Sequence, residues 1–486
     1  MRDYQLHARR PAEDGGAQIL STRTLRNSST IWTALACLGA LGAAASGCGF
    51  SSPVAAACGP NATEDFITCA LNMAPIVQPG SDTRQIVYQA PGKLRVLHGQ
   101  SCVSAPRAAD SKQFAFRIQQ SETLPAAYAD SATVFMNGWK LRYQNGDHHV
   151  QGFGSAIVNI NESRQLDGLQ LQWEAGGVLS DQNGDDPYEW CYSYTIVGWT
   201  RSSSGFDAVA GERGRAFIRP SDPGNSTALH LISGAARNSY GSGVVLPQGF
   251  AMMWDDHGDR HVIQTGFDYG QHYSSGTGEM AWTSRALFKD NGDNNDYYAA
   301  ELVSTMTYSS PQQYHPVEVS VQTPQGFKTR TNSVSLTPMA SDSFCTAVGD
   351  STPTVQQFRI DNVPYAYAVP ILTGWELGYL CTDHHVEQMG AAITDFRFER
   401  APDASGGTLF YTLELALGDA SGNINYAGAS VDVLGMKPLS AGPQPLFGEG
   451  ESPAIDTGDA GPLDSDEIPE IDSGDVNELD VENAEN

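Results

Sequence analysis

Apolar and polar residues alternate in many short stretches of this chain, and a two-residue period predicts β-strands. In residues 138–143, Trp139, Leu141 and Tyr143 fall on one face, while the two basic residues point the other way. Clusters of Asn, Gly and Asp follow such stretches, and no long run has the 3.6-residue period of a helix. The pattern predicts an all-β chain of antiparallel β-sandwich-like units.

One phrase of this pattern occurs three times, in residues 138–154, 249–266 and 374–390. Each copy has Gly followed by an aromatic residue, then Asp-x-His-Val, then Gly five residues after the His. The histidines recur 112 and 124 residues apart, so the repeating unit is as large as a domain. We therefore expect a leader (1–48), a tether with a Cys-bounded loop (49–90), three tandem β domains (91–205, 206–315 and 316–440) and a tail (441–486).

The N-terminal region has the features of an export signal. Arg23 and Arg26 precede an apolar run, 31–45, which is shorter than the ~20 residues that cross a bilayer. The small-residue triplet Ala45-Ser46-Gly47 then precedes Cys48, and this arrangement resembles the lipobox of bacterial lipoproteins. The resemblance implies a lipidated Cys48 and a protein anchored on the non-cytoplasmic side of the cell envelope, at the outer membrane or the cell surface. The alternative is cleavage after Ala57, which yields a secreted protein.

Charge is unevenly distributed along the 486 residues. The net charge is −28, and the segment Gly448–Asn486 contains 14 acidic residues and no Lys or Arg. Such a segment buries too little apolar area to fold, so we expect a disordered acidic tail. A polyanion repels nucleic acid, which excludes that class of partner. The expected partners are the membrane, through the lipid anchor, and a glycan or another envelope protein.

None of the eight cysteines has the C-x-x-C spacing of a zinc or redox site. In an exported chain, widely spaced cysteines indicate disulfides. If Cys37 is removed with the leader and Cys48 is lipidated, six remain, and six allow fifteen pairings. We favour pairing within each unit of the chain: Cys58–Cys69, Cys102–Cys191 and Cys345–Cys381.

The Asp-x-His-Val phrase is the leading candidate site. A strand places Asp147 and His149 on the same face, where a carboxylate and an imidazole can ligate a metal or contact a polar ligand. The other interpretation is that the pair fixes the hairpin, because a feature present in every copy often serves the fold. The corresponding pairs in the other copies are Asp259 with His261 and Asp383 with His385.

Two further features of the first copy suggest ligands. Asp181, Asn183, Asp185 and Asp186 place oxygen atoms at near-alternate positions, as Ca²⁺ sites do, although a simple Asp-rich turn has the same composition. The aromatic set is expected to be core, or in part a sugar-stacking face, with Tyr188 and Trp190 the most exposed. This set consists of Trp139, Tyr143, Trp173, Trp190 and Tyr192.

Signatures of common enzyme classes are absent: the sequence has no G-x-S-x-G, H-E-x-x-H, P-loop or G-x-G-x-x-G motif. The strand order, with Trp173 and Trp199, loosely resembles H-type lectin domains, and the resemblance implies small β-sandwiches that bind sugars. We expect a surface-anchored, non-catalytic binding or adhesion protein with carbohydrate as the leading ligand. The alternatives are a structural envelope lipoprotein without a small ligand and a metal-dependent hydrolase.

The substitution Cys48→Ser tests the export interpretation. If Cys48 carries the lipid, the variant should lose fatty-acid labelling and move from the membrane fraction to the soluble fraction. Mass spectrometry of the mature N-terminus gives the cleavage site. A mature chain that begins after Ala57 in the unaltered protein would contradict lipidation at Cys48.

Overall fold

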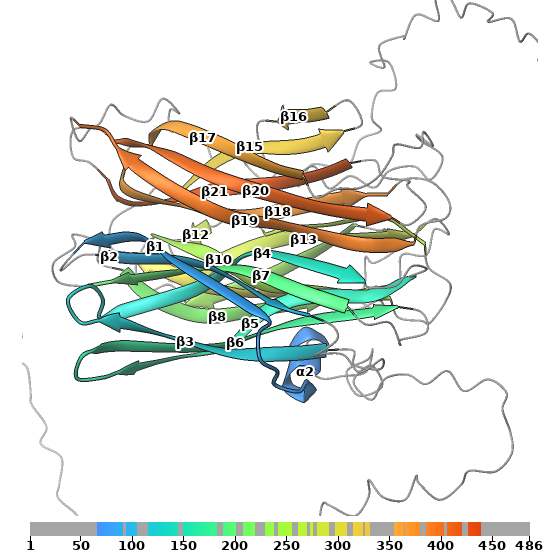
Figure 1. The fold of residues 1–486 in the computed structure, drawn as a ribbon, viewed down its shortest axis with the longest axis horizontal. Helices are drawn as coiled ribbons and strands as arrows, with labels where there is room; N and C mark the ends of the chain where they lie inside the picture. Colours follow the sequence, from blue (N-terminus) through green and yellow to red (C-terminus); the bar gives the residue numbers. More distant parts are fainter. Residues whose placement is uncertain are drawn as a thin grey trace, which may run out of the picture. The chain divides into compact units, whose positions relative to one another are not determined.

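The computed structural model places most of the β-rich part of the chain, and nearly all of that part is antiparallel β-sheet (Figure 1). The expected all-β class is confirmed. The described residues are 66–90, 94–104, 115–143, 149–181, 188–200, 208–218, 229–237, 242–254, 261–269, 273–275, 279–290, 297–308, 314–323, 326–330, 354–363, 365–379, 385–402, 406–419 and 426–438. The expected leader and acidic tail lie outside them.

The described strands form three sheets. In spatial order, sheet A consists of β3 (Ala115–Pro125), β6 (Gly168–Asp181), β5 (Val150–Arg164), β10 (Ser242–Trp254), β14 (Tyr297–Tyr308) and β8 (Ala208–Ile218). In the same order, sheet B consists of β1 (Ser81–Ala90), β2 (Leu94–Val103), β7 (Tyr188–Trp199), β4 (Ser131–Tyr143), β19 (Val386–Arg400), β20 (Gly407–Asp419) and β17 (Thr354–Val363). Sheet C consists of β12 (Tyr273–Ser275), β13 (Glu279–Asp290), β11 (Val262–Asp268), β18 (Tyr365–Gly378), β21 (Tyr426–Pro438), β15 (Tyr314–Thr323) and β16 (Gly326–Arg330), with β9 (Leu229–Arg237) also paired to β13.

The three copies of the repeat share these sheets, so the expected division into three separate domains is not confirmed. In each copy, the strand with the Gly-aromatic phrase and the next strand enter different sheets. Strand β5 pairs with β10, β11 pairs with β18, and β19 pairs with β4. Every sheet is therefore half one copy and half another, and the copies form a single compact unit. The repeat length carries no information about which strand each edge pairs with.

The glycine that ends each phrase lies at one of these junctions between copies. Gly154 is opposite Ala251, and an added Cβ would lie 2.6 Å from the carbonyl oxygen of Phe250. Gly390 is opposite Lys140, and its Cβ would lie 2.5 Å from the carbonyl oxygen of Trp139. No side chain fits at such a distance, which explains why glycine recurs there. The third junction has the same register, with Gly266 opposite Glu376.

The aromatic residue of each phrase points into one shared core. The ring centroids of Trp139, Phe250 and Trp375 lie 4.8–5.0 Å apart, and the three side chains are at most 1% exposed. Each ring comes from a different copy and a different sheet. The three sheets therefore face a common centre, and the core is continuous across all three copies.

A buried polar residue precedes the first glycine of each phrase, at a β-bulge. Asn137 donates to the carbonyl oxygen of Pro370 (2.9 Å) and accepts from the backbone amide of Leu372 (2.9 Å), so it joins the first copy to the third. Gln248 donates to the carbonyl oxygen of Val134 and joins the second copy to the first. These side chains satisfy backbone groups at positions where the bulges interrupt the strand pairing.

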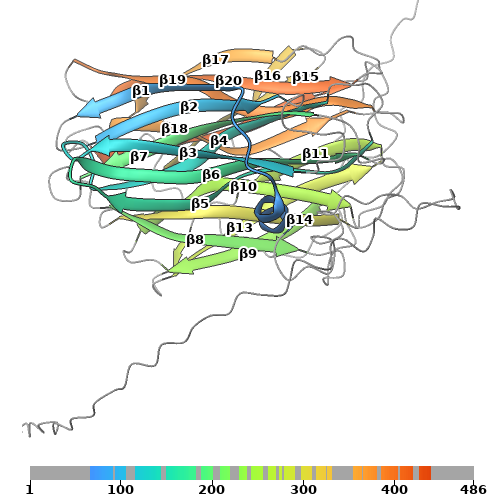
Figure 2. The same cartoon turned by 60° about the horizontal axis from the view of Figure 1, so that its bottom comes forward.

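Residues 66–90, expected to form part of the tether, are built into the fold instead. Helix α2 (Phe66–Met73) packs Ile67, Ala70 and Leu71 against the outer face of sheet A, where it lies mainly over β3, β6 and β5 (Figure 2). Strand β1 forms the edge of sheet B. In the part of the chain that the structure describes, no helix is both long and apolar enough to cross a bilayer.

The predicted disulfide Cys102–Cys191 is confirmed, and it links residues directly opposite each other on β2 and β7. Cys69 is also disulfide-bonded. Cys58, Cys345, Cys381 and the proposed lipidation site Cys48 lie outside the described residues.

The shared core predicts that the copies unfold together. Trp375→Ala removes a ring that contacts the other two copies, and we expect it to lower the free energy of unfolding by about 3–5 kcal/mol. Chemical denaturation followed by circular dichroism should show one transition that shifts as a whole. The exposed β17 residue Val355 provides a control, because Val355→Ala should shift the transition little. Loss of only part of the signal in Trp375→Ala would indicate independently folding copies.

Candidate functional site

The three histidines of the Asp-x-His-Val phrases meet at one end of the fold. The ring centroid of His149 lies 4.4 Å from that of His261 and 5.2 Å from that of His385. Each histidine directly precedes a strand (β5, β11 and β19), and all three side chains are half-buried. We call these residues the histidine triad. The sequence predicted pairs within each copy, and the structure instead brings together one residue from every copy.

The valine after each histidine pairs across the sheet with the Asp that ends β6, β13 or β20. The side chains of Asp181 and Asp290 are buried. The remaining candidate ligands, Asp147, Asp259, Asp383, Asn183, Asp185 and Asp186, lie outside the described residues. Among the described residues, no group of three or more His, Cys, Asp or Glu side chains is arranged to hold a metal ion as it stands. The cross-strand pairs are Val150 with Asp181, Val262 with Asp290 and Val386 with Asp419.

The five aromatic residues singled out in the first copy are core, as their strand positions predicted, and these five offer no sugar-stacking face. Tyr188 and Trp190, expected to be the most exposed, are both 0% exposed. Strand β7 lies inside sheet B and is covered on its inner face by sheet A, so Trp190 packs over Gly177 and donates to Ser155 (3.0 Å). Proximity to the Asp loop was a poor guide to exposure, because β7 begins at Tyr188 and is already covered there.

A polar cleft of about 280 Å³ lies on sheet A, and we call it the amide cleft. Its floor includes an irregularity in β5, where Asn159 adopts a positive φ of 51° and shifts the register of pairing with β6. Asn161 and Gln172 lie directly opposite each other across these strands, and both are exposed. The cleft is lined by Gln119, Gln120, Ser121, Asn159, Asn161, Gln172, Trp173 and Glu174.

The carboxylate of the amide cleft is held ionised by its neighbours. Glu174 accepts hydrogen bonds from Gln119 (3.1 Å), Asn159 (2.8 Å) and Arg117 (2.8 Å). Partial burial opposes the charge, but these bonds outweigh it and the pKa of Glu174 is lowered. The cleft therefore presents a fixed carboxylate together with several amide donors and acceptors.

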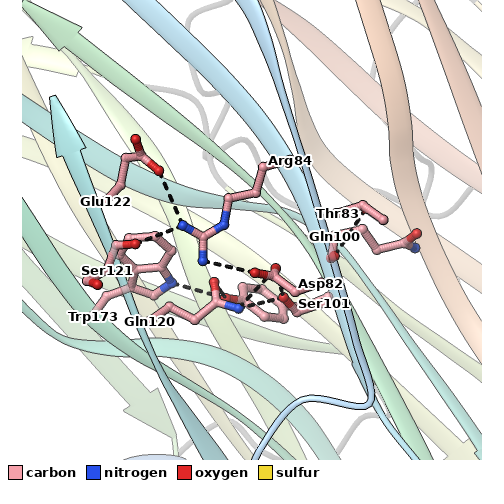
Figure 3. Close-up of polar contacts among 10 residues, drawn as sticks. Asp82, Thr83, Arg84, Gln100, Ser101, Gln120, Ser121, Glu122 and Trp173 are labelled. Atoms are coloured by element: carbon pink, nitrogen blue, oxygen red, sulfur yellow. Dashed lines mark hydrogen bonds and ion pairs between the residues drawn. The ribbon is translucent and has the colours of Figure 1, made fainter.

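Arg84 of β1 lines a second cleft of about 300 Å³ and contacts residues that line the amide cleft (Figure 3). Its guanidinium donates to the carbonyl oxygen of Ser121 (2.7 Å), pairs with Asp82 (3.0 Å) and Glu122 (3.2 Å), and lies 5.7 Å from the ring centroid of Trp173. Because its donors are used in these contacts, Arg84 holds β1 against sheet A rather than presenting a free cation.

The second cleft lies between β1, β2 and β19 and includes a buried histidine. His98 is 2% exposed, and its Nδ1 lies 3.1 Å from the hydroxyl oxygen of Thr195, which accepts from Asn137 (3.0 Å). Burial is the largest influence on His98, and it lowers its pKa to about 4, so the ring is neutral at physiological pH. The cleft is lined by Thr83, Arg84, Gln85, His98, Gly99, Gln100, Thr394 and Asp395.

Glu301 of β14 also has a strongly shifted pKa. It accepts hydrogen bonds from Trp282 (2.9 Å) and Ser284, and complete burial raises its pKa to about 7 despite these bonds. Neither of the two clefts includes it. We therefore assign Glu301 a structural role between β13 and β14.

Sequence reasoning missed both clefts, although a signal for the first was present. On β6, polar residues occupy the outward positions Gln170, Gln172 and Glu174, and this pattern by itself is typical of any solvated sheet face. The cleft arises because β5 bulges beside them, and a bulge at Asn159 has no distinctive sequence pattern.

No protein-family model matches this chain, and neither a curated protein nor a solved structure matches it.

Burial of Glu301 makes stability depend on pH. Its folded pKa of about 7 exceeds the ordinary carboxyl value of 4.5, so the stability contribution is complete below pH 4.5 and is lost as pH rises toward 7. The loss from this group is about 3 kcal/mol. Glu301→Gln should remove this pH-dependent loss of stability. The stability of the variant relative to the wild type should therefore increase when the pH is raised from 4.5 to 8. Denaturation at both pH values measures the difference, with Glu399→Gln as an exposed control. An equal difference at both pH values would contradict the prediction.

Proposed function

We propose that this protein is an exported, surface-anchored, non-catalytic binding protein whose amide cleft takes a hydroxyl-rich ligand, with carbohydrate as the leading class. The observation that carries the proposal is the lining of the cleft. Amide side chains offer both donors and acceptors, and hydroxyl groups need both. The exposed pair Asn161 and Gln172 and the fixed carboxylate of Glu174 supply these groups on a rigid sheet face.

The buried aromatic residues define how such a ligand is held. Trp173 and Trp190 are at most 1% exposed, so the ligand rests on hydrogen bonds rather than on ring stacking. Hydrogen bonds exchanged with water contribute only about 1 kcal/mol each, so affinity for a single sugar unit is weak. Anchoring many copies on one surface through Cys48 compensates by multivalent attachment.

A structural envelope lipoprotein without a small ligand is the second candidate, and the complete burial of the large aromatic residues favours it. In that case the sheet faces contact other envelope components, and the amide cleft is a solvated irregularity. The two candidates differ in a measurable way, because only the first predicts binding that depends on Asn161 and Gln172.

A glycan array probed with the protein, with and without Ca²⁺, tests the first candidate. We expect binding to a subset of glycans, and the double substitution Asn161→Ala with Gln172→Ala should weaken it at least tenfold. The matched control is Ser163→Ala with Gln170→Ala, because this cross-strand pair on the same two strands lies outside the cleft lining. No binding in either condition, or equal loss in the control, would favour the structural candidate.

A further inference from the structure

The histidine triad is not explained by the proposed function, because it belongs to neither cleft. Its members come from equivalent positions of three copies, each one residue before a buried valine. We propose that His149, His261 and His385 together bind one divalent late first-row transition-metal ion, such as Zn²⁺ or Co²⁺.

The spacing of the rings fits a shared ion. Imidazoles bound to one metal at ~2.1 Å place their ring centres roughly 5 Å apart. The observed separations from His149 are 4.4 Å and 5.2 Å. The side chains as they stand are not arranged to ligate, so binding requires the rings to turn about their side-chain torsions. All three side chains are half-buried, but Nε2 of His149 and Nδ1 of His261 are themselves buried, so an ion reaches these atoms only when the rings turn.

The ligands select the class of ion. Imidazole nitrogen suits Zn²⁺, Co²⁺ and Ni²⁺, whereas Ca²⁺ prefers oxygen ligands. The triad is therefore distinct from the calcium loop expected at Asp181.

The full chain, purified without an oligohistidine tag, tests the proposal at pH 7.5. Titration with Co²⁺, followed by its visible absorption, and with Zn²⁺, followed by calorimetry, should show one ion per chain. Each of His149→Ala, His261→Ala and His385→Ala should weaken binding at least about tenfold. Zn²⁺ should also raise the melting temperature of the wild type but not of these variants, since the ion ties three copies together. Melting without metal shows whether each variant is folded.

A matched control separates the triad from other metal ligands. His148→Ala removes a neighbouring histidine that the middle copy replaces with Arg260, so it should leave binding unchanged. Binding by the acidic tail would persist in all three triad variants. Absence of one-to-one binding, persistence of binding in the triad variants, or an equal loss in His148→Ala would overturn the proposal.

Discussion

The contact of Trp139, Phe250 and Trp375 is the constraint on which the rest of the fold depends. One ring from each copy fills the centre, so no copy can bury its own ring without the other two. The three strands that carry these rings belong to three different sheets. Each of them pairs with the strand that follows the phrase in another copy, so β4 pairs with β19, β10 with β5 and β18 with β11.

Buried polar side chains at the β-bulges also join the copies. A bulge precedes each phrase, and at two of the three bulges the polar residue reaches across to a carbonyl group of a strand from another copy. Asn137 in addition donates to Thr195, and Thr195 contacts His98 beneath the second cleft. Hydrogen bonds through Asn137 therefore connect the junction between the first and third copies to His98, which lines the second cleft. A substitution at Asn137 is expected to disturb the junction and the cleft together.

The sequence carried enough information for the class of fold, but not for the way in which the copies of the repeated phrase share their sheets. The alternation of apolar and polar residues in 138–143 indicates that one face of this strand is buried. That pattern is equally compatible with a sandwich inside each copy and with sheets shared between copies. The Cys102–Cys191 bridge was predictable because both residues lie within one unit. The meeting of His149 with His261 depends on three-dimensional register between copies, which no local pattern encodes.

Packing explains why some of the residues common to the three copies recur, but it does not explain the histidines. The glycines are needed where backbones approach too closely for a side chain, as at Gly154 and Gly390. The aromatic residues fill the core, and the valine after each histidine is 1% exposed. The histidines are different, because a half-buried position at the end of a strand accepts many polar residues. The ring of His149 lies within 5.2 Å of the rings of both other histidines, and packing alone does not require that arrangement, which is why we propose a shared ion there.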